Sequence, residues 1–92
     1  MKEPYAQIGG VRRGWVNLSW PFANISVNTD RICISVGPIN RTSIEKLTIH
    51  NGIFSTGLRI WRRGNSEKLI FWSRDIVELK KALVELNYKI DS

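Results

Sequence analysis

The chain has 92 residues, of which 42% are hydrophobic and 24% charged, and its formal net charge at pH 7 is +6. This length predicts one domain, and this composition is typical of a folded globular protein and excludes a disordered or fibrous one. The single cysteine, Cys33, excludes an internal disulfide framework, and no apolar run approaches the ~18 residues that a membrane-spanning helix needs. Because the first residues lack the apolar region of a signal peptide, we expect a cytoplasmic location.

Residues 1–12 show no clear hydrophobic period and contain a proline and a pair of adjacent glycines. We therefore expect an N-terminal arm or irregular edge here, followed by a folded domain over residues 13–92. The first strand is predicted over residues 14–20, where apolar and polar side chains alternate. It should end at Pro21, because proline cannot donate a hydrogen bond to a neighbouring strand.

The clearest hairpin follows. A second strand begins at Ile25, an Asn-Thr-Asp turn occupies residues 28–30, and apolar residues alternate again over 32–36. The Gly-Pro pair at 37–38 should end this third strand, and we expect residues 39–43 to be a simple connection.

Residues 44–50 form the next predicted strand. Ile44 is out of phase with the apolar residues that follow it, so we expect a β-bulge near residues 45–46. The Asn-Gly pair at 51–52 predicts a two-residue hairpin turn. The strand after that turn should place two sets of side chains on opposite faces. The core-facing set is Phe54, Leu58 and Ile60, and the other set is Ile53, Arg59, Trp61 and Arg63.

An apolar strand over residues 69–72 leads directly into an amphipathic helix, predicted over residues 74–87. Ser73 is a suitable N-cap, and Asn87 is a suitable stop. The side chains that should pack on the strands recur at steps of three and four: Ile76, Leu79, Leu83 and Leu86.

Two valines of this helix, Val77 and Val84, fall outside the apolar stripe. They either widen the buried face or form a second contact surface. The whole chain therefore shows six or seven short strands and then one helix. This order predicts a mainly β fold with one C-terminal α-helix, an antiparallel sandwich or partly open barrel that the helix caps.

Three segments together resemble small bacterial pleckstrin-homology-like (PH-like) proteins and the related GRAM-type domains: Trp20–Ile25 before a hairpin, Gly57–Ile60, and Leu69–Trp72 before a terminal helix. The resemblance covers about residues 13–88 and consists mostly of core pattern. It implies two roughly orthogonal antiparallel sheets, with the helix closing one open end. It carries no function with it, because one fold serves many functions.

One departure from this family concerns lipid binding. Members that bind inositol phosphates carry several Lys and Arg residues at the end of the first strand and the start of the second. Residues 19–24 of this chain contain no basic residue, so we expect no phosphoinositide binding by that route. Trp20 and Phe22 could instead form an apolar loop, although capping of the core is the more ordinary interpretation.

No catalytic constellation stands out. His50 and Cys33 are the only residues of their types, and the carboxylates are scattered along the chain. A metal site would need three or four ligands, and a nucleophilic pair would need a third orienting group. We therefore expect a protein that is not an enzyme and that uses no cofactor or metal.

The candidate binding face is Arg59, Trp61, Arg62, Arg63 and Lys68. Alternating basic and aromatic residues on a strand suit a protein interface, because Trp and Arg are common in interface hot spots. They also suit an electrostatic site for anionic lipid or nucleic acid, which the net charge of +6 favours. The plainer interpretation is a solvated face on which the tryptophan packs across strands. We expect a non-enzymatic binding module that contacts another protein or itself, with the electrostatic binder as the alternative.

Overall fold

The computed structural model describes residues 5–14, 16–35, 37–53 and 55–91, and for residues 19–21 it describes the backbone only. Our expectations for Val36, Phe54 and the side chain of Trp20 therefore lie outside the described residues. The elements, in chain order, are β1 (Tyr5–Arg13), β2 (Val16–Val27), β3 (Arg31–Ile34), β4 (Gly37–Asn40), the 3₁₀ turn η1 (Arg41–Ser43), β5 (Ile44–Asn51), β6 (Thr56–Arg62), β7 (Leu69–Ser73), α1 (Ile76–Glu85) and β8 (Ile90–Asp91). The fold is mainly β with one C-terminal helix, as predicted.

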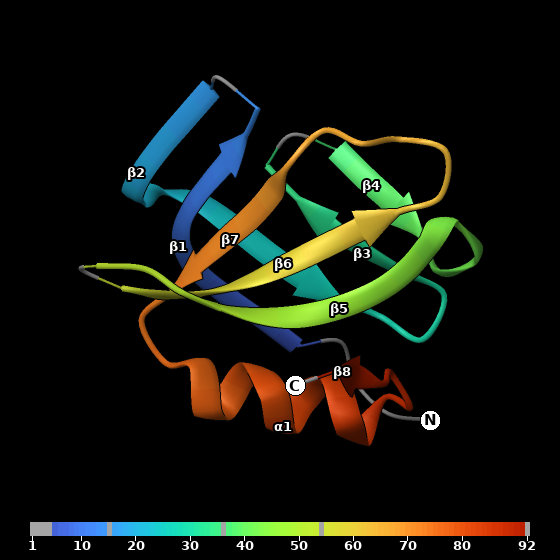
Figure 1. The fold of residues 1–92 in the computed structure, drawn as a ribbon. Helices are drawn as coiled ribbons and strands as arrows, with labels where there is room; N and C mark the ends of the chain where they lie inside the picture. The colour runs from blue at the N-terminus through green and yellow to red at the C-terminus, as the bar shows by residue number, and fades with distance from the viewer. Residues whose placement is uncertain (1–4, 15, 36, 54, 92) are drawn as a thin grey trace.

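The strands form one curved sheet in the order β4-β3-β2-β1-β7-β6-β5-β8. All neighbours pair antiparallel except β8, which runs parallel to β5. Figure 1 shows the strands curling around a common interior, with α1 lying across the end below them. The described residues contain eight strands instead of the expected six or seven, because two short edge strands and an N-terminal strand carry little hydrophobic pattern.

The expectation of an N-terminal arm over residues 1–12 is wrong for its described part. β1 lies inside the sheet, between β2 and β7, and Val11 pairs with both Leu18 and Phe71. The glycines that suggested an irregular segment have a packing role instead. A Cβ atom on Gly9 would lie 2.2 Å from the backbone oxygen of Trp72, so the close approach of β1 to β7 requires glycine there.

Pro21 interrupts the hydrogen-bond ladder but does not end the strand. β2 continues to Val27, and its pairing with β1 jumps from Val11–Leu18 to Gly9–Ala23. Four β2 residues thus face the single residue Gly10, and β2 bends sharply at this point in Figure 1. The next hairpin is confirmed, since Val27 pairs with Ile32 across the predicted turn. Residues 37–40 form strand β4 instead of a connection.

The bulge predicted near residues 45–46 is confirmed, because the β5–β6 register shifts between Ile44 and Lys46. The prediction of a two-residue turn at 51–52 is wrong. Asn51 pairs with Thr56, so residues 52–55 form a four-residue loop. Relative to the tight turn, the partner strand moves by an even number of residues, which keeps Leu58 and Ile60 on the core face and Arg59 and Trp61 on the other.

α1 begins later than predicted. Its N-cap is Asp75, whose carboxylate accepts a hydrogen bond from the Glu78 amide at 3.1 Å. Ser73, the predicted N-cap, lies at the end of β7 and accepts a bond from the Asp75 amide instead. The predicted stop is confirmed, because Asn87 has a φ of 65°. The Tyr88 amide donates to the Leu83 carbonyl across this residue, which is a Schellman ending.

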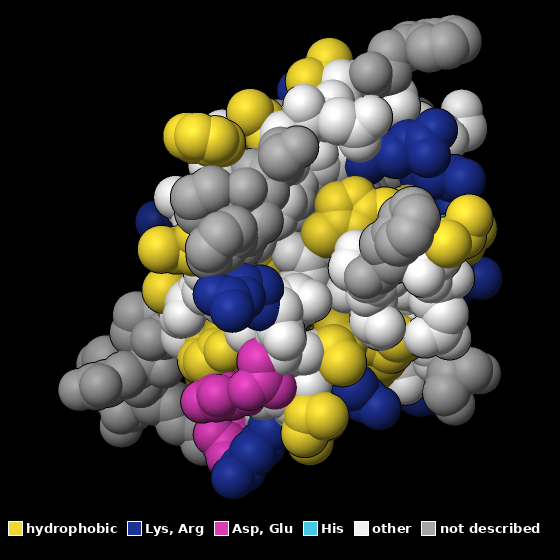
Figure 2. All heavy atoms as spheres, turned by 90° about the vertical axis from the view of Figure 1, so that its left-hand side faces the viewer, with side chains coloured by type: hydrophobic (Ala, Val, Ile, Leu, Met, Phe, Trp, Pro, Cys, Tyr) yellow, Lys and Arg dark blue, Asp and Glu magenta, His cyan; other side chains and the backbone are white. Residues whose placement is uncertain are grey.

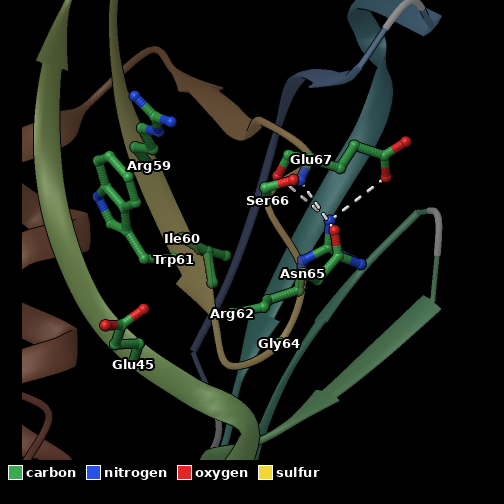
Figure 3. Close-up of a pocket in the computed structure, with 9 residues that line it drawn as sticks. All are labelled: Glu45, Arg59, Ile60, Trp61, Arg62, Gly64, Asn65, Ser66 and Glu67. Carbon is green, nitrogen blue, oxygen red and sulfur yellow. Dashed lines mark hydrogen bonds and ion pairs between the residues drawn. The ribbon is translucent and has the colours of Figure 1, made fainter.

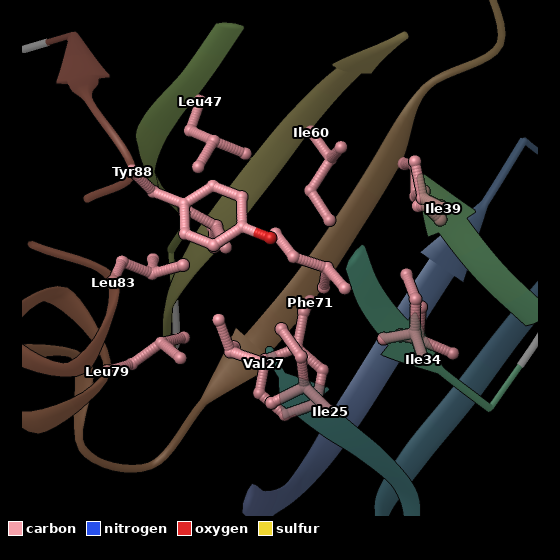
Figure 4. Packing of buried hydrophobic residues seen from close by; sticks show 14 of the residues in the cluster. Ile25, Val27, Ile34, Ile39, Leu47, Ile60, Phe71, Leu79, Leu83 and Tyr88 are labelled. Carbon is pink, nitrogen blue, oxygen red and sulfur yellow. The ribbon is translucent and has the colours of Figure 1, made fainter. Parts of the chain in front are cut away.

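The helix closes the interior with the predicted stripe. Leu79 and Leu83 are fully buried and point with Tyr88 toward side chains from the strands, including Phe71 (Figure 4). Val77 and Val84 are exposed, so they do not widen the buried face. Among the described residues, no helix is long and apolar enough to cross a membrane.

Candidate functional site

The outer face of β5, β6 and β7 carries the charged and aromatic residues that could bind a ligand. Cross-strand pairing arranges them in rows. One row pairs Lys46 with Trp61, and the next runs through Thr48, Arg59, Ile70 and Arg12. Arg59 and Trp61 thus share a face, as their alternation predicted. Figure 3 shows both side chains on one side of β6, whereas Ile60 and Arg62 point to the other.

Two cationic groups pack on the same indole ring. The Arg59 guanidinium carbon lies 3.6 Å from the centroid of the Trp61 ring, and the Lys46 ammonium lies 4.5 Å from it. The indole Nε1 donates a hydrogen bond to the Thr48 hydroxyl at 2.9 Å, which fixes the ring on β5. Packing of this kind holds both cations in place by cation–π attraction.

Neither cation has a carboxylate partner among the described residues. Nearby, Glu67 pairs instead with Arg13 and with Arg62. A hydrogen bond from Arg13 is the main reason why the pKa of Glu67 lies below its ordinary value. Glu45, on the bulge, is exposed and lines the same hollow as Arg59. Lys46 and Arg59 therefore keep their donors available to an incoming anion.

Lys46 was absent from the sequence-based face. The signal that could have found it is the bulge, because the extra residue Glu45 brings Lys46, and not its neighbour, opposite Trp61. The other three members of the predicted face do not join Arg59 and Trp61. Arg62 faces the opposite side and pairs with Glu67, Arg63 is exposed in the turn after β6, and Lys68 is half-buried before β7.

A hollow of about 440 Å³ opens beside this face, between the end of β6 and the loop that follows it. It forms because the β6–β7 ladder ends at the Arg59–Ile70 pair, whereas β6 continues to Arg62. Its lining is shown in Figure 3: Glu45, Arg59, Ile60, Trp61, Arg62, Gly64, Asn65, Ser66 and Glu67. The Nε atom of Arg62 is buried and has no hydrogen-bond partner among the described residues.

A second tryptophan lies on the same outer face, one row further along the strands. Trp72 pairs with Gly57 on one side and Gly10 on the other, and His50 pairs with Gly57. The Trp72 and His50 rings meet edge to face at 5.5 Å. A hollow of about 520 Å³ lies between Trp72 and the β5–β6 loop, and one of about 320 Å³ lies on its β1 and β2 side. The sequence showed Trp72 only as part of an apolar strand.

Other sequence-based candidates remain apart. Cys33 is on β3 and His50 on β5, and four strands separate these two in the sheet. Within the described ranges, no three His, Cys, Asp or Glu side chains gather closely enough to hold a metal ion. Capping of the core by Phe22 is wrong, because 75% of its surface is exposed.

Figure 2 views the molecule from the end that contains the β5–β6 loop. Hydrophobic and neutral side chains are interspersed there with Lys and Arg side chains, and the acidic side chains gather in one area beside one of these cations. Exposed apolar residues of the described chain include Val16, Phe22 and Ile53. The chain matches no family model, no curated protein and no solved structure.

Proposed function

We propose that the chain is a non-enzymatic binding module with a PH-like fold. The support for the fold is the strand order β4-β3-β2-β1 followed by β7-β6-β5, together with a helix that lies across one end of the curved sheet. Such an arrangement suits two antiparallel sheets that share β1 and β7 at their junction. The fold alone names no partner, so the partner is argued from the site.

The module recognises an acidic segment of a partner protein through the Lys46/Arg59/Trp61 face. The observation that carries this proposal is that two cations, which have no carboxylate partner among the described residues, are held against one indole ring. Holding the side chains in place before binding lowers the entropy that binding would otherwise cost. Carboxylates of the partner would complete charge-assisted hydrogen bonds to the guanidinium.

A protein partner suits this face better than single-stranded nucleic acid does. Binding of single strands relies on aromatic rings on which bases stack. The Trp61 ring already carries Arg59 and Lys46, so it offers no open platform. A carboxylate needs only the donors of Lys46, which is exposed, and of Arg59, which is half-buried.

The test measures binding of a fluorescein-labelled decaglutamate peptide by fluorescence anisotropy. Replacing both Lys46 and Arg59 with Ala should weaken binding at least ten-fold. The matched control replaces Arg31 and Lys81, exposed residues of β3 and α1, and removes the same charge. The control should change the affinity less than three-fold, because it leaves the face intact. Equal losses in both variants would show that net charge alone drives binding and would overturn the proposal.

Two further arms separate the partner classes. The same proteins are titrated with a single-stranded oligonucleotide and with vesicles that contain phosphatidylserine. Tighter binding of either ligand than of the peptide, lost on the same two substitutions, would replace the protein partner with that ligand. Sedimentation of the unliganded protein over a range of concentrations tests self-association, the other form of the predicted interaction.

A further inference from the structure

The two hollows beside Trp72 arise because its neighbours on the adjacent strands are glycines. Its neighbours in the row, Gly57 and Gly10, have no side chains to fill the surface next to the indole. The ring leans over Gly57, where an added Cβ would lie 3.1 Å from the indole Cε3. The hollow toward the β5–β6 loop is lined by His50, Asn51, Gly52, Ile53, Ser55 and Trp72. The opposite hollow is lined by Gly10, Asn17, Leu18, Ser55, Trp72, Ser73 and Arg74.

These hollows lie on the same outer face as the paired cations, at a distance that the strand geometry fixes. The Trp72 row crosses β6 at Gly57, two residues from Arg59 and four from Trp61. Because a strand rises about 3.3 Å per residue, the offset along β6 is roughly 7 to 13 Å. An extended polypeptide covers that distance in two to four residues.

We propose that the hollows beside Trp72 are an apolar subsite for the same acidic segment, which lies extended along β6. Its carboxylate contacts Arg59 and Lys46, and an aliphatic or aromatic side chain two or four residues away packs against Trp72. Side chains of an extended chain alternate between its two sides, so only an even offset presents both groups to this face. This inference rests on the proposed function, since the cations supply the first contact.

The charges beside the apolar subsite favour a polypeptide ligand that carries a carboxylate. Arg59 and Lys46 have no carboxylate partner among the described residues. On the outer face, Arg59 lies in the row next to Trp72, and Lys46 lies one row further away. Trp72 itself is half-buried. Beside it, in the lining of the same hollow, lies the large apolar side chain of Ile53, which is 93% exposed. One partner segment can therefore satisfy the cations and cover apolar surface at the same time.

The experiment uses capped, fluorescein-labelled peptides in which Glu-Ser-Glu is joined to one leucine through serines. The offset from the second glutamate to the leucine runs from one to six residues. The affinity should be highest at an offset of two or four, at least three-fold above offsets of one, three and five. Ser55, which lines both hollows and is exposed, is replaced with Tyr to fill them without altering the core.

Ser55→Tyr should abolish the advantage of the even offsets and leave binding of decaglutamate unchanged. Thr42→Tyr, an exposed position on η1, is the matched control and should keep the advantage. This inference would be overturned if the affinity of the leucine peptides did not depend on the offset. It would also be overturned if the even offsets kept their advantage in Ser55→Tyr. If decaglutamate binding still depends on Lys46 and Arg59 in that case, the proposed function survives. If replacing those two residues leaves decaglutamate binding unchanged, the proposed function fails instead.

Discussion

The helix α1 offers the sharpest test of how this small core is held together. Leu83 is fully buried in the cluster that joins the helix to the strands, and the next residue, Val84, is 60% exposed. Leu83→Ala removes about three buried carbon groups, worth roughly 0.8 kcal/mol each, and leaves a cavity, so the total loss should be about 3–4 kcal/mol. A domain of this length has a free energy of unfolding of roughly 5–14 kcal/mol, so this loss is a large part of it.

Urea unfolding, followed by tryptophan fluorescence and by circular dichroism, measures the change. With a slope of about 1.4 kcal/mol per molar urea, the midpoint should fall by roughly 2–3 M. Val84→Ala is the matched control, because it shortens the neighbouring side chain in the same helix; it should change stability by less than about 0.5 kcal/mol. Similar midpoints for the two variants would refute the assignment of α1 as the element that closes the core.

Three further changes test other parts of the fold. Asp75→Ala should lower the free energy of unfolding by about 1 kcal/mol, because it leaves a first-turn amide without its cap; Asp75→Asn should restore most of the loss. Gly57→Ala would place a methyl group 2.7 Å from Cγ2 of Ile70. This overpacking should lower the free energy of unfolding by about 1–3 kcal/mol. An unchanged urea midpoint would contradict this expectation. The pKa of Glu67 is lowered in the folded state, mainly by the hydrogen bond from Arg13, so its contribution to stability is present above the ordinary value of 4.5 and is lost as the pH falls below it. The stability difference between pH 7 and pH 3 should therefore shrink in Glu67→Gln, and an identical difference in both proteins would contradict the argument.

Local pattern was sufficient where one residue type or period decides the conformation. The β2–β3 hairpin, the bulge in β5 and the end of α1 at Asn87 all follow from a few neighbouring residues. β1 was missed because its glycines serve a close contact with β7, some sixty residues away, and that contact leaves no hydrophobic period. The prediction of a two-residue turn at 51–52 was wrong for a similar reason. Gly52 also lies in close contact with a distant strand, because an added Cβ on it would lie 2.9 Å from the ring of Trp72.

The candidate site was predictable along one strand but not across strands. Alternation alone placed Arg59 and Trp61 together and should also have placed Arg62 on the opposite face, because it follows Trp61 directly. Lys46 and Trp72 come from neighbouring strands, and their positions depend on registers that a single sequence does not reveal. The ion pair of Glu67 with Arg13 joins the loop before β7 to β1, 54 residues away, so it also depends on how distant strands pair.

The place of β1 in the sheet has a consequence for how the chain folds. β1 needs both β2 and β7 as neighbours, and its pairing of Gly9 with Ser73 closes a loop of more than sixty residues. Such long-range pairing has a high entropic cost before any contact offsets it, so folding should be slow for a domain of this size, on the order of milliseconds to seconds. On a ribosome, the edge of β1 that β7 covers would stay open until residue 73 had emerged, which makes this edge the part of the nascent chain most exposed to misassociation.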